Sequence, residues 1–373
     1  MAKLETFCNI NMGQSPDSTT YNTEKKGLPF FQGNADFGEI HPKTRIWCSA
    51  PTKVANAGDI LISVRAPIGA LNIANEKCCI GRGLSALTVN HSVCDQTFLW
   101  YALASKVDEL NSKGTGSTFK AINKKALGET EIFLPPLDEQ YHIAAILDKV
   151  TDLINKRRAQ LDKLDLLVKS RFIEMFGNPK QNPNGYPMKE FNDISVLITD
   201  GEHVTPRRVE KGIFLLSARN VLNHALNLDD VDYIDEDEYT RISRRVVPQG
   251  GDVLISCSGS IGRCCVVPDG LQFQMVRSTA LIRFDDSINP IFAEWLITSD
   301  ELQRQISMAA TQSSQANLFQ GKIKKLRGYV PPMSLQTQFA SFVTQTNELK
   351  LLIQQNLDEL KKLKAAIIQT YFN

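Results

Sequence analysis

The fold is decided by a segment that occurs twice, first as Gly58-Asp59-Ile60-Leu61-Ile62-Ser63 and again as Gly251-Asp252-Val253-Leu254-Ile255-Ser256. The proline pair in Leu134-Pro135-Pro136-Leu137 likewise returns as Val330-Pro331-Pro332-Met333. The offset between the copies drifts only from 193 to 196 residues, so insertions are few. A repeat of this length predicts two duplicated domains in tandem, because solenoid repeats are much shorter.

Each copy begins with short β-branched runs that are divided by Gly and Pro, a pattern typical of strands. These runs are residues 59–64 and 71–74 in the first copy and residues 253–257 and 264–267 in the second. One helix is expected after them in each copy, at residues 96–110 and 291–308. The fold class is therefore predicted to be α+β, with two tandem-duplicated α/β domains.

A long helix is predicted after each proline pair, because no Pro or Gly follows until Gly177 in the first copy or until the end of the sequence in the second. Apolar residues recur along it at alternating spacings of four and three, which indicates a coiled coil. We expect the two helices to pair as an antiparallel coiled coil. The domain boundaries that follow are residues 1–136 and 188–333 for the two domains, 137–176 and 334–373 for their helices, and 177–187 for a Gly-, Asn- and Pro-rich linker.

A second apolar stripe widens the face of each predicted helix beyond what a two-stranded seam requires. We expect other subunits to dock there, on Ile146, Leu153, Leu167, Phe172, Phe342, Leu349, Leu363 and Ile368. The alternative is that these side chains pack inside a lone globular domain.

The composition limits the function classes. Lys and Arg number 42 and Asp and Glu 41, so the net charge of +1 gives no overall attraction to nucleic acid or membrane. No run of 18 apolar residues is present, and no membrane association is expected. The eight cysteines lack a CxxC spacing, and the adjacent pair Cys78-Cys79 lies in a predicted strand whose neighbours face opposite sides. Buried, reduced cysteines and a cytoplasmic location are therefore predicted.

A search for catalytic motifs yields no catalytic residue, no metal site and no cofactor bound by this chain. Gly321-Lys322 is followed by Ile323, so the magnesium-binding hydroxyl of a phosphate-binding loop is missing. The string Pro16-Asp17 with Glu24-Lys25-Lys26 resembles a nuclease pattern, but it lies in a polar, loop-like segment instead of on adjacent buried strands. These features favour a binding protein over an enzyme.

Two similar domains related by a pseudo-twofold axis are suited to duplex DNA, which has local twofold symmetry. Arginine can bind guanine through two hydrogen bonds, and small polar side chains suit base edges and phosphates. The DNA-binding candidates are Gln14, Ser15, Arg65, Arg82, Lys113, Thr115, Ser117, Lys120, His203, Thr205, Arg207, Arg208, Arg219, Arg263, Arg277, Gln312 and Ser313. Arg207 and Arg208 are expected to bind phosphate, since no acidic residue is nearer to them in the sequence than Glu202 and Glu210. For each candidate the alternative is a surface ion pair.

Three segments of the sequence match a known family: Gly13-Gln14-Ser15-Pro16, Asp200-Gly201-Glu202-His203-Val204-Thr205-Pro206 and Leu134-Pro135-Pro136-Leu137-Asp138-Glu139-Gln140. Through these segments the chain resembles, along essentially its whole length, the specificity subunit of type I restriction–modification systems. The duplicated order of domain and helix adds to this resemblance. The sequence departs from the family pattern at Glu202, where a small residue is usual, and in Met333-Ser334-Leu335-Gln336, which lacks an acidic residue.

This resemblance implies that each domain recognises one half of a bipartite, asymmetric double-stranded DNA site and that the helices space the two halves. It implies docking of two methyltransferase subunits, which use S-adenosylmethionine, and of restriction and motor subunits, which use ATP and magnesium. The chain itself would be non-catalytic. Two other hypotheses are a non-catalytic coiled-coil adaptor whose globules bind protein and a fragment of a fused restriction–methyltransferase enzyme.

Overall fold

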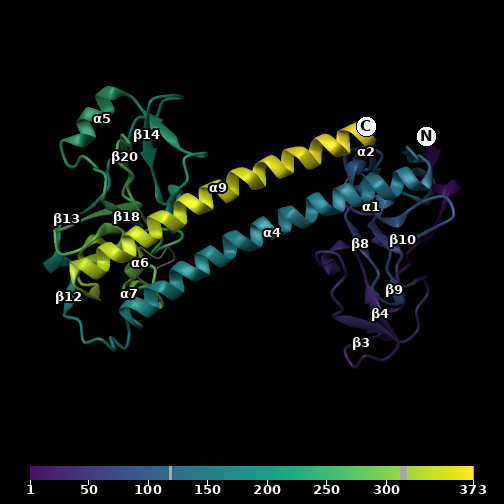
Figure 1. Ribbon diagram of the computed structural model, residues 1–373, viewed down its shortest axis with the longest axis horizontal. Helices are drawn as coiled ribbons and strands as arrows, with labels where there is room; N and C mark the ends of the chain where they lie inside the picture. The colour runs from purple at the N-terminus through teal and green to yellow at the C-terminus, as the bar shows by residue number, and fades with distance from the viewer. Residues whose placement is uncertain (117–119, 311–316, 373) are drawn as a thin grey trace. The chain divides into compact units, whose positions relative to one another are not determined.

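The computed structural model describes residues 1–116, 120–310 and 317–372. The chain divides into two compact units. Unit 1 comprises Met1–Ala159 with Gln354–Asn373, and unit 2 comprises Gln160–Ile353. Figure 1 shows the helices and strands of both units.

Unit 1 is built on a four-stranded antiparallel sheet in the order β2-β10-β7-β8. The strands are β2 (Cys8–Met12), β7 (Ile60–Ser63), β8 (Leu71–Ile73) and β10 (Leu84–Val89). A five-stranded sheet, β3-β5-β4-β9-β6, contains β3 (Tyr21–Asn22), β4 (Leu28–Phe31), β5 (Ile46–Cys48), β6 (Val54–Ala55) and β9 (Cys78–Ile80). β1 (Ala2–Lys3) pairs with β11 (Glu131–Ile132), and the short helices are α1 (Gln96–Ser105), α2 (Val107–Ser112) and α3 (Lys124–Gly128).

Unit 2 contains a four-stranded antiparallel sheet with the corresponding order, β13-β21-β18-β19. Its strands are β13 (Ser195–Asp200), β18 (Val253–Ser256), β19 (Cys264–Val266) and β21 (Thr279–Phe284). A second sheet, β17-β14-β20, contains β14 (Ile213–Leu216), β17 (Asp232–Ile234) and β20 (Phe273–Met275), with a parallel β14–β20 pair like β4–β9 of unit 1. The remaining elements are β12 (Met188–Glu190) paired with β22 (Arg327–Tyr329), β15 (Val221–Leu222) paired with β16 (Ala225–Leu226), and α5 (Glu236–Ser243), α6 (Pro290–Ile297), α7 (Asp300–Ala309) and α8 (Gln320–Ile323).

The single helix expected in each copy is wrong, because the structure has two helices there, α1 and α2 in unit 1 and α6 and α7 in unit 2. In unit 2 the break follows from capping. The Ser299 side chain accepts a hydrogen bond from the amide of Leu302 and so begins a new helix. In unit 1 the chain tightens at Lys106, whose amide bonds to the carbonyl of Leu103.

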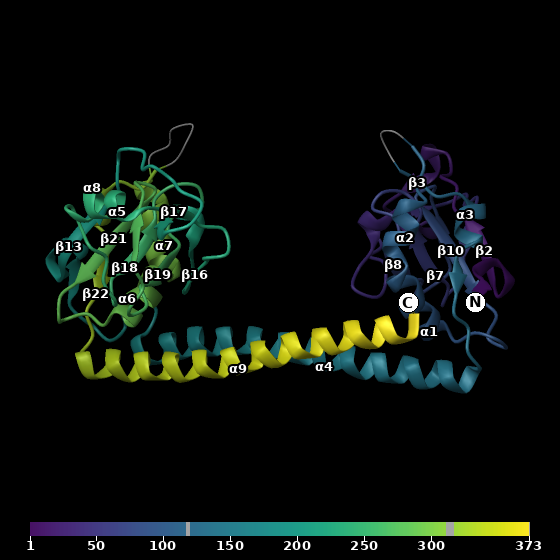
Figure 2. The same ribbon diagram turned by 90° about the horizontal axis from the view of Figure 1, so that it is seen from above.

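The two long helices are α4 (Leu137–Phe176) and α9 (Met333–Phe372), each of 40 residues. In unit 1, Phe372 of α9 packs with Ile143 and Leu147 of α4 in a common core. In unit 2, Phe172 of α4 and Phe339 of α9 meet edge to face, with ring centroids 5.4 Å apart. Figure 2 shows the helices at the base of the globular part of each unit. No helix in the described ranges is long and apolar enough to cross a membrane.

All eight cysteines are buried and unpaired. Burial raises the pKa of the Cys78 thiol to about 12 and that of Cys257 to about 12. Such thiols stay protonated near neutral pH, so they are inert as nucleophiles and serve as small apolar side chains.

A buried glutamine fixes the start of each long helix to the globular part. Gln140 is fully buried; its amide nitrogen donates to the carbonyls of Pro135 and Val93, and its oxygen accepts from the amide of Asp95 at 2.8 Å. Gln336, 196 residues later, is also fully buried and makes the same three contacts, with Pro331, Ser287 and Asn289. The Leu-Pro-Pro run is thus the point at which the helix is anchored.

Replacing Gln140 with Ala should lower the free energy of unfolding of unit 1 by about 1–3 kcal/mol, because three backbone groups lose their partner in a buried site. Urea unfolding followed by circular dichroism measures the change. The matched control is Gln338→Ala on α9, where the side chain is exposed. Equal unfolding midpoints for the two variants would contradict the anchoring role.

Candidate nucleic-acid interface

The strand directions of unit 1 bring several loops together at one edge of its four-stranded sheet. β10 pairs antiparallel with both β2 and β7, with Ser85 opposite Met12 and Leu84 opposite Ser63. The chain segments that leave β2 and β7 therefore meet the segment that enters β10. We call this the distal edge. In unit 1 it comprises residues 13–16, 64–66 and 81–83, and it lies opposite the sheet edge that leads to the Gln140 anchor.

Backbone hydrogen bonds hold the distal edge of unit 1. The amide of Gly13 donates to the carbonyl of Leu84 at 2.9 Å, and the amide of Val64 donates to the carbonyl of Gly83 at 2.9 Å. Unit 2 repeats both bonds, from Gly201 to Thr279 at 2.9 Å and from Cys257 to Ser278 at 2.8 Å. The distal edge of unit 2 accordingly comprises residues 201–206, 257–258 and 276–278.

Five of the predicted DNA-binding residues of unit 1 gather at or beside its distal edge. The Ser15 hydroxyl accepts hydrogen bonds from the side chain of Gln32 at 3.0 Å and from the amide of Arg82 at 3.3 Å. Lys120 lies beside Arg65, because its carbonyl accepts from the amide of Ala66 at 3.0 Å. The residues brought together are Gln14, Ser15, Arg65, Arg82 and Lys120.

The cationic side chains of this edge are available to a ligand. Arg65, Arg82 and Lys120 are exposed, and none of them has a carboxylate within ion-pair distance in the described part of unit 1. Lys113 differs, because its ammonium forms an ion pair with Glu109 at 2.6 Å. Thr115 is exposed and exchanges backbone hydrogen bonds with Ala121. Of the charged candidates in the described part of unit 1, Lys113 is therefore the one that already has a carboxylate partner.

At the distal edge of unit 2, four predicted residues line one shallow cavity of about 260 Å³: His203, Thr205, Arg208 and Arg277. Two backbone hydrogen bonds build it. The amide of Glu202 donates to the carbonyl of Met275, and the amide of Arg277 donates to the carbonyl of Glu202. Sequence reasoning missed Glu202 and Ser278 as lining residues, since neither belongs to a basic or amide-rich pattern.

Arg207 and Arg208 have no acidic residue nearer in the sequence than Glu202 and Glu210, but the fold brings two more distant carboxylates to them. Arg207 pairs with Asp235, and the Nε of Arg208 donates to Asp232 at 2.9 Å. Asp232 also binds Arg219 at 3.0 Å. Partial burial of Asp232 opposes ionisation, yet the hydrogen bond from Arg208 and the charge of Arg219 hold the pKa of its carboxyl below the usual range. The acidic segment around β17 thus neutralises arginines that the sequence alone leaves free.

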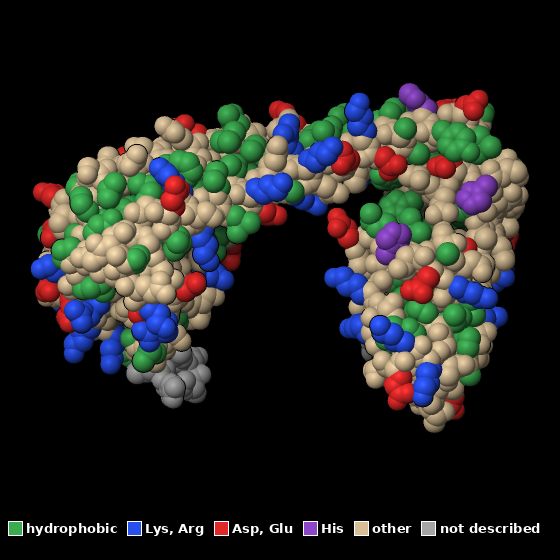
Figure 3. Space-filling view, turned by 60° about the horizontal axis from the view of Figure 1, so that its bottom comes forward, with side chains coloured by type: hydrophobic (Ala, Val, Ile, Leu, Met, Phe, Trp, Pro, Cys, Tyr) green, Lys and Arg blue, Asp and Glu red, His purple; other side chains and the backbone are tan. Residues whose placement is uncertain are grey.

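Four further DNA-binding candidates lie apart from these groups or outside the described residues. Arg263 is half-buried, immediately precedes β19 and has no carboxylate partner in the described residues. Ser117, Gln312 and Ser313 lie outside the described residues. On the face drawn in Figure 3, Lys and Arg side chains occur on the globular part of each unit, interspersed with Asp and Glu. Within residues 1–116, 120–310 and 317–372, no three His, Cys, Asp or Glu side chains lie together in a way that could hold a metal ion.

The predicted docking stripe is partly open and partly buried. Phe172 is only 3% exposed and packs against Phe176 and Phe339, so it belongs to the core of unit 2 and not to an open face. Leu167, Leu349 and Leu363 are exposed by 46–49%. The other four, Ile146, Leu153, Phe342 and Ile368, are half-buried.

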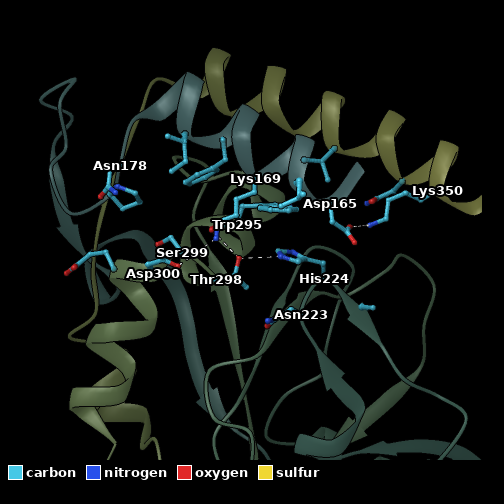
Figure 4. A pocket seen from close by; sticks show the side chains of 18 residues that line it. Asp165, Lys169, Asn178, Asn223, His224, Trp295, Thr298, Ser299, Asp300 and Lys350 are labelled. Atoms are coloured by element: carbon cyan, nitrogen blue, oxygen red, sulfur yellow. Dashed lines mark hydrogen bonds and ion pairs between the residues drawn. The ribbon is translucent and has the colours of Figure 1, made fainter. Parts of the chain in front are cut away.

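A larger cavity of about 530 Å³ lies in unit 2 between the two long helices and the globular part (Figure 4). Leu166 and Ile173 of α4 line it, together with Trp295 of α6. The Trp295 ring stacks on His224 with centroids 4.0 Å apart. The cavity is therefore bordered by apolar and aromatic surface next to the exposed leucines of the stripe.

The comparisons with known proteins agree with these features. Residues 1–163 match the family described as Type I restriction modification DNA specificity domain. The chain is 45% identical over 161 residues to the putative type I restriction enzyme MjaX specificity subunit of Methanocaldococcus jannaschii, a match that covers 43% of this chain and 38% of that protein. It is 20% identical to the type I restriction enzyme EcoBI specificity subunit of Escherichia coli, over 90% of this chain and 76% of that protein.

A solved structure shows the same fold over the whole chain. It is the S subunit of a type I restriction–modification system from M. genitalium, which is 14% identical and has a TM-score of 0.62 over 100% of this chain and 95% of that one. Residues 1–163, less than half of the chain, thus match a type I restriction–modification DNA specificity domain, and the chain spans only 38% of the length of the MjaX relative. The chain is similar to the specificity subunits of type I restriction–modification systems, the family that its sequence resembles.

Proposed function

We propose that this chain gives a type I restriction–modification complex its DNA sequence specificity, with each distal edge recognising one half of a bipartite, asymmetric double-stranded site. The observation that carries the proposal is that the same edge occurs in both units with the same backbone hydrogen bonds but with unlike side chains. Ser15 lies at the first edge with Gln32 bonded to it, whereas His203 lies at the second with Arg208 lining the same cavity. The same backbone arrangement with different side chains suits two domains that recognise different bases.

A tandem duplication accounts for this arrangement. The corresponding sheet orders, β2-β10-β7-β8 and β13-β21-β18-β19, support it. The matched anchors at Gln140 and Gln336 also support it. We further propose that α4 and α9 pair as an antiparallel coiled coil that spaces the two halves of the site. The contacts of Arg157 with Asn356 in unit 1 and of Asp165 with Lys350 in unit 2 support this pairing.

The chain is proposed to be non-catalytic. S-adenosylmethionine would be used by two methyltransferase subunits, and ATP and magnesium by restriction and motor subunits. The competing hypothesis is a coiled-coil adaptor whose globules bind protein. Exposed, unpaired Arg65, Arg82 and Lys120 at a single edge favour DNA, because binding to phosphates needs cations that are free to exchange their counterions.

Exchanging the second domain should change one half of the recognised site. In a chimaera that carries residues 185–333 from another family member, methylation sequencing of cells that also contain the methyltransferase subunits should show one altered and one unaltered half. The chimaera carrying the same replacement for residues 1–136 is the reciprocal control. Alteration of both halves, or of neither, would contradict the proposal.

The docking of methyltransferase subunits is proposed to use the exposed leucines of the long helices in unit 2. Leu166 is 63% exposed and Leu352 is 62% exposed, values that are high for large apolar side chains. Burying a leucine against a partner contributes about 1.5–3 kcal/mol. These two positions therefore offer a sensitive test of the surface.

The double variant Leu166→Asp and Leu352→Asp should bind the methyltransferase subunit at least about tenfold more weakly, because two charged groups would have to be desolvated in the interface. Analytical ultracentrifugation of the mixed subunits measures this. Gln345→Asp, which places a carboxylate at an exposed position of α9, is the control. Wild-type affinity in the double variant would place the docking surface elsewhere.

Asp232 is proposed to limit non-specific DNA binding by unit 2. The Asp232→Asn change should release Arg208, whereas Arg219 keeps Asp230 at 3.7 Å. Affinity for a duplex of unrelated sequence should therefore rise, and the slope of log affinity against log salt concentration should steepen by about one phosphate contact. Asp237→Asn on α5 removes one exposed negative charge without freeing an arginine and is the control. Identical salt slopes for the two variants would show that the arginines have only a structural role.

A further inference from the structure

Arg82 and Arg277 occupy the same place in the backbone of the two units. In unit 1 the residue two positions before the arginine, Ile80, accepts a hydrogen bond from the amide of Gln14 at 3.1 Å. In unit 2 the residue two positions before it, Met275, accepts from the amide of Glu202 at 2.8 Å. The next residue after each arginine supplies the carbonyl that binds Val64 in one unit and Cys257 in the other.

The segments that hold these arginines are packed against a glycine in both units. A Cβ on Gly13 would lie 2.2 Å from the carbonyl oxygen of Gly81, and a Cβ on Gly201 would lie 2.4 Å from those of Met275 and Val276. Contacts this short exclude any side chain at either glycine. The backbone of each arginine is therefore fixed at the same depth relative to its sheet.

The two arginines are also alike in having no ion-pair partner among the described residues of their units. Both are exposed, and neither has a carboxylate within 4.0 Å in the described residues of its unit. Arg82 and Arg277 are the two predicted arginines that occupy corresponding positions in the two units. The position that corresponds to Arg65 is Ser258, and the position that corresponds to Arg263 is Ala70. Arg207, Arg208 and Arg219 are bound to carboxylates.

A side chain that is repeated in two edges with otherwise different side chains needs a ligand feature that both half-sites share. The feature that every DNA sequence shares is the phosphate backbone, whereas base edges differ from site to site. We infer that Arg82 and Arg277 each bind a backbone phosphate, at the same position in the two half-sites, and set the register in which the neighbouring side chains meet the bases. This inference rests on the proposed function.

The test uses Arg82→Ala and Arg277→Ala, singly and together, in the full chain. The probes are a duplex that contains the motif found by methylation sequencing and a duplex of the same length with that motif scrambled. Each single change should weaken binding to both duplexes by a similar factor of about ten near 0.1 M salt. The slope of log affinity against log salt concentration should fall by about 0.9 per arginine.

Lysine separates a phosphate contact from a base contact. Arg82→Lys and Arg277→Lys keep the positive charge but lose the planar fork that binds guanine through two hydrogen bonds. For a phosphate contact we expect the lysine variants to stay within about threefold of wild type. The methylated motif in cells that contain the methyltransferase subunits should be unchanged in all variants. Arg327→Ala on β22 is the control, because that arginine is also exposed and without a carboxylate partner in the described residues but lies on the strand that leads to α9.

Two results would overturn the inference. If the motif relaxes at one base position in the lysine and alanine variants alike, the arginine reads a base. If the alanine variants match Arg327→Ala in affinity and salt slope, the arginines are solvated surface. Thermal unfolding by circular dichroism, expected to be unchanged, verifies that each variant is folded. A wild-type chain that does not distinguish the two duplexes would instead refute the proposed function, and the inference would fall with it.

Discussion

The buried amide of Gln140, and its counterpart in Gln336, is the interaction on which the arrangement of each unit depends. A fully buried primary amide must satisfy both its donors and its acceptor, and here all three contacts are to backbone groups at the junction of sheet, short helix and long helix. Because these groups come from two chain segments, residues 93–95 and Pro135, the glutamine ties the start of the long helix to the segment that enters α1. The helix start is thus fixed at one edge of the sheet, which leaves the opposite edge open for recognition.

The open edge follows from the strand directions and not from any special loop. A central strand, β10 or β21, runs antiparallel to both of its neighbours, so three loops must meet where it begins. The repeated Gly-Asp segment serves the other end. Gly58 has a φ of +90°, which favours glycine, and the Asp59 carboxylate accepts the amide of Asn56 at 2.8 Å. The strongest sequence repeat therefore forms the turn that enters β7. The candidate DNA-binding side chains lie in segments that are less similar between the two copies.

This division explains how much the sequence could predict. The repeat, the strands around residues 60 and 253 and the 40-residue helices follow from local pattern and from the absence of Pro and Gly. The sequence could name Gln14, Ser15 and Arg82 as separate candidates. It could not show that they lie together, because their proximity depends on strand pairing between distant segments. The ion pairs of Arg207 and Arg208 with Asp235 and Asp232 span 24 to 28 residues, and helical periodicity cannot show that Phe172 is covered by Phe339. Local capping by Ser299, which divides the predicted helix, was visible in the sequence as a serine followed by acidic residues.

The pairing of charges also bears on the proposed recognition of one DNA sequence by a chain of small net charge. Phosphate contacts raise affinity for every duplex, so each additional free cation strengthens binding to competing sites as well as to the target. In unit 2 the carboxylates of Asp232 and Asp235 hold three arginines, which leaves few free cations at that edge, Arg277 among them. An arginine released from Asp232 must lose that ion pair before it gains a DNA contact, and only a well-placed partner on the DNA offsets this loss. Under the proposed function, acidic side chains beside the edge would lower general affinity more than specific affinity, and the small net charge would be a means of discrimination.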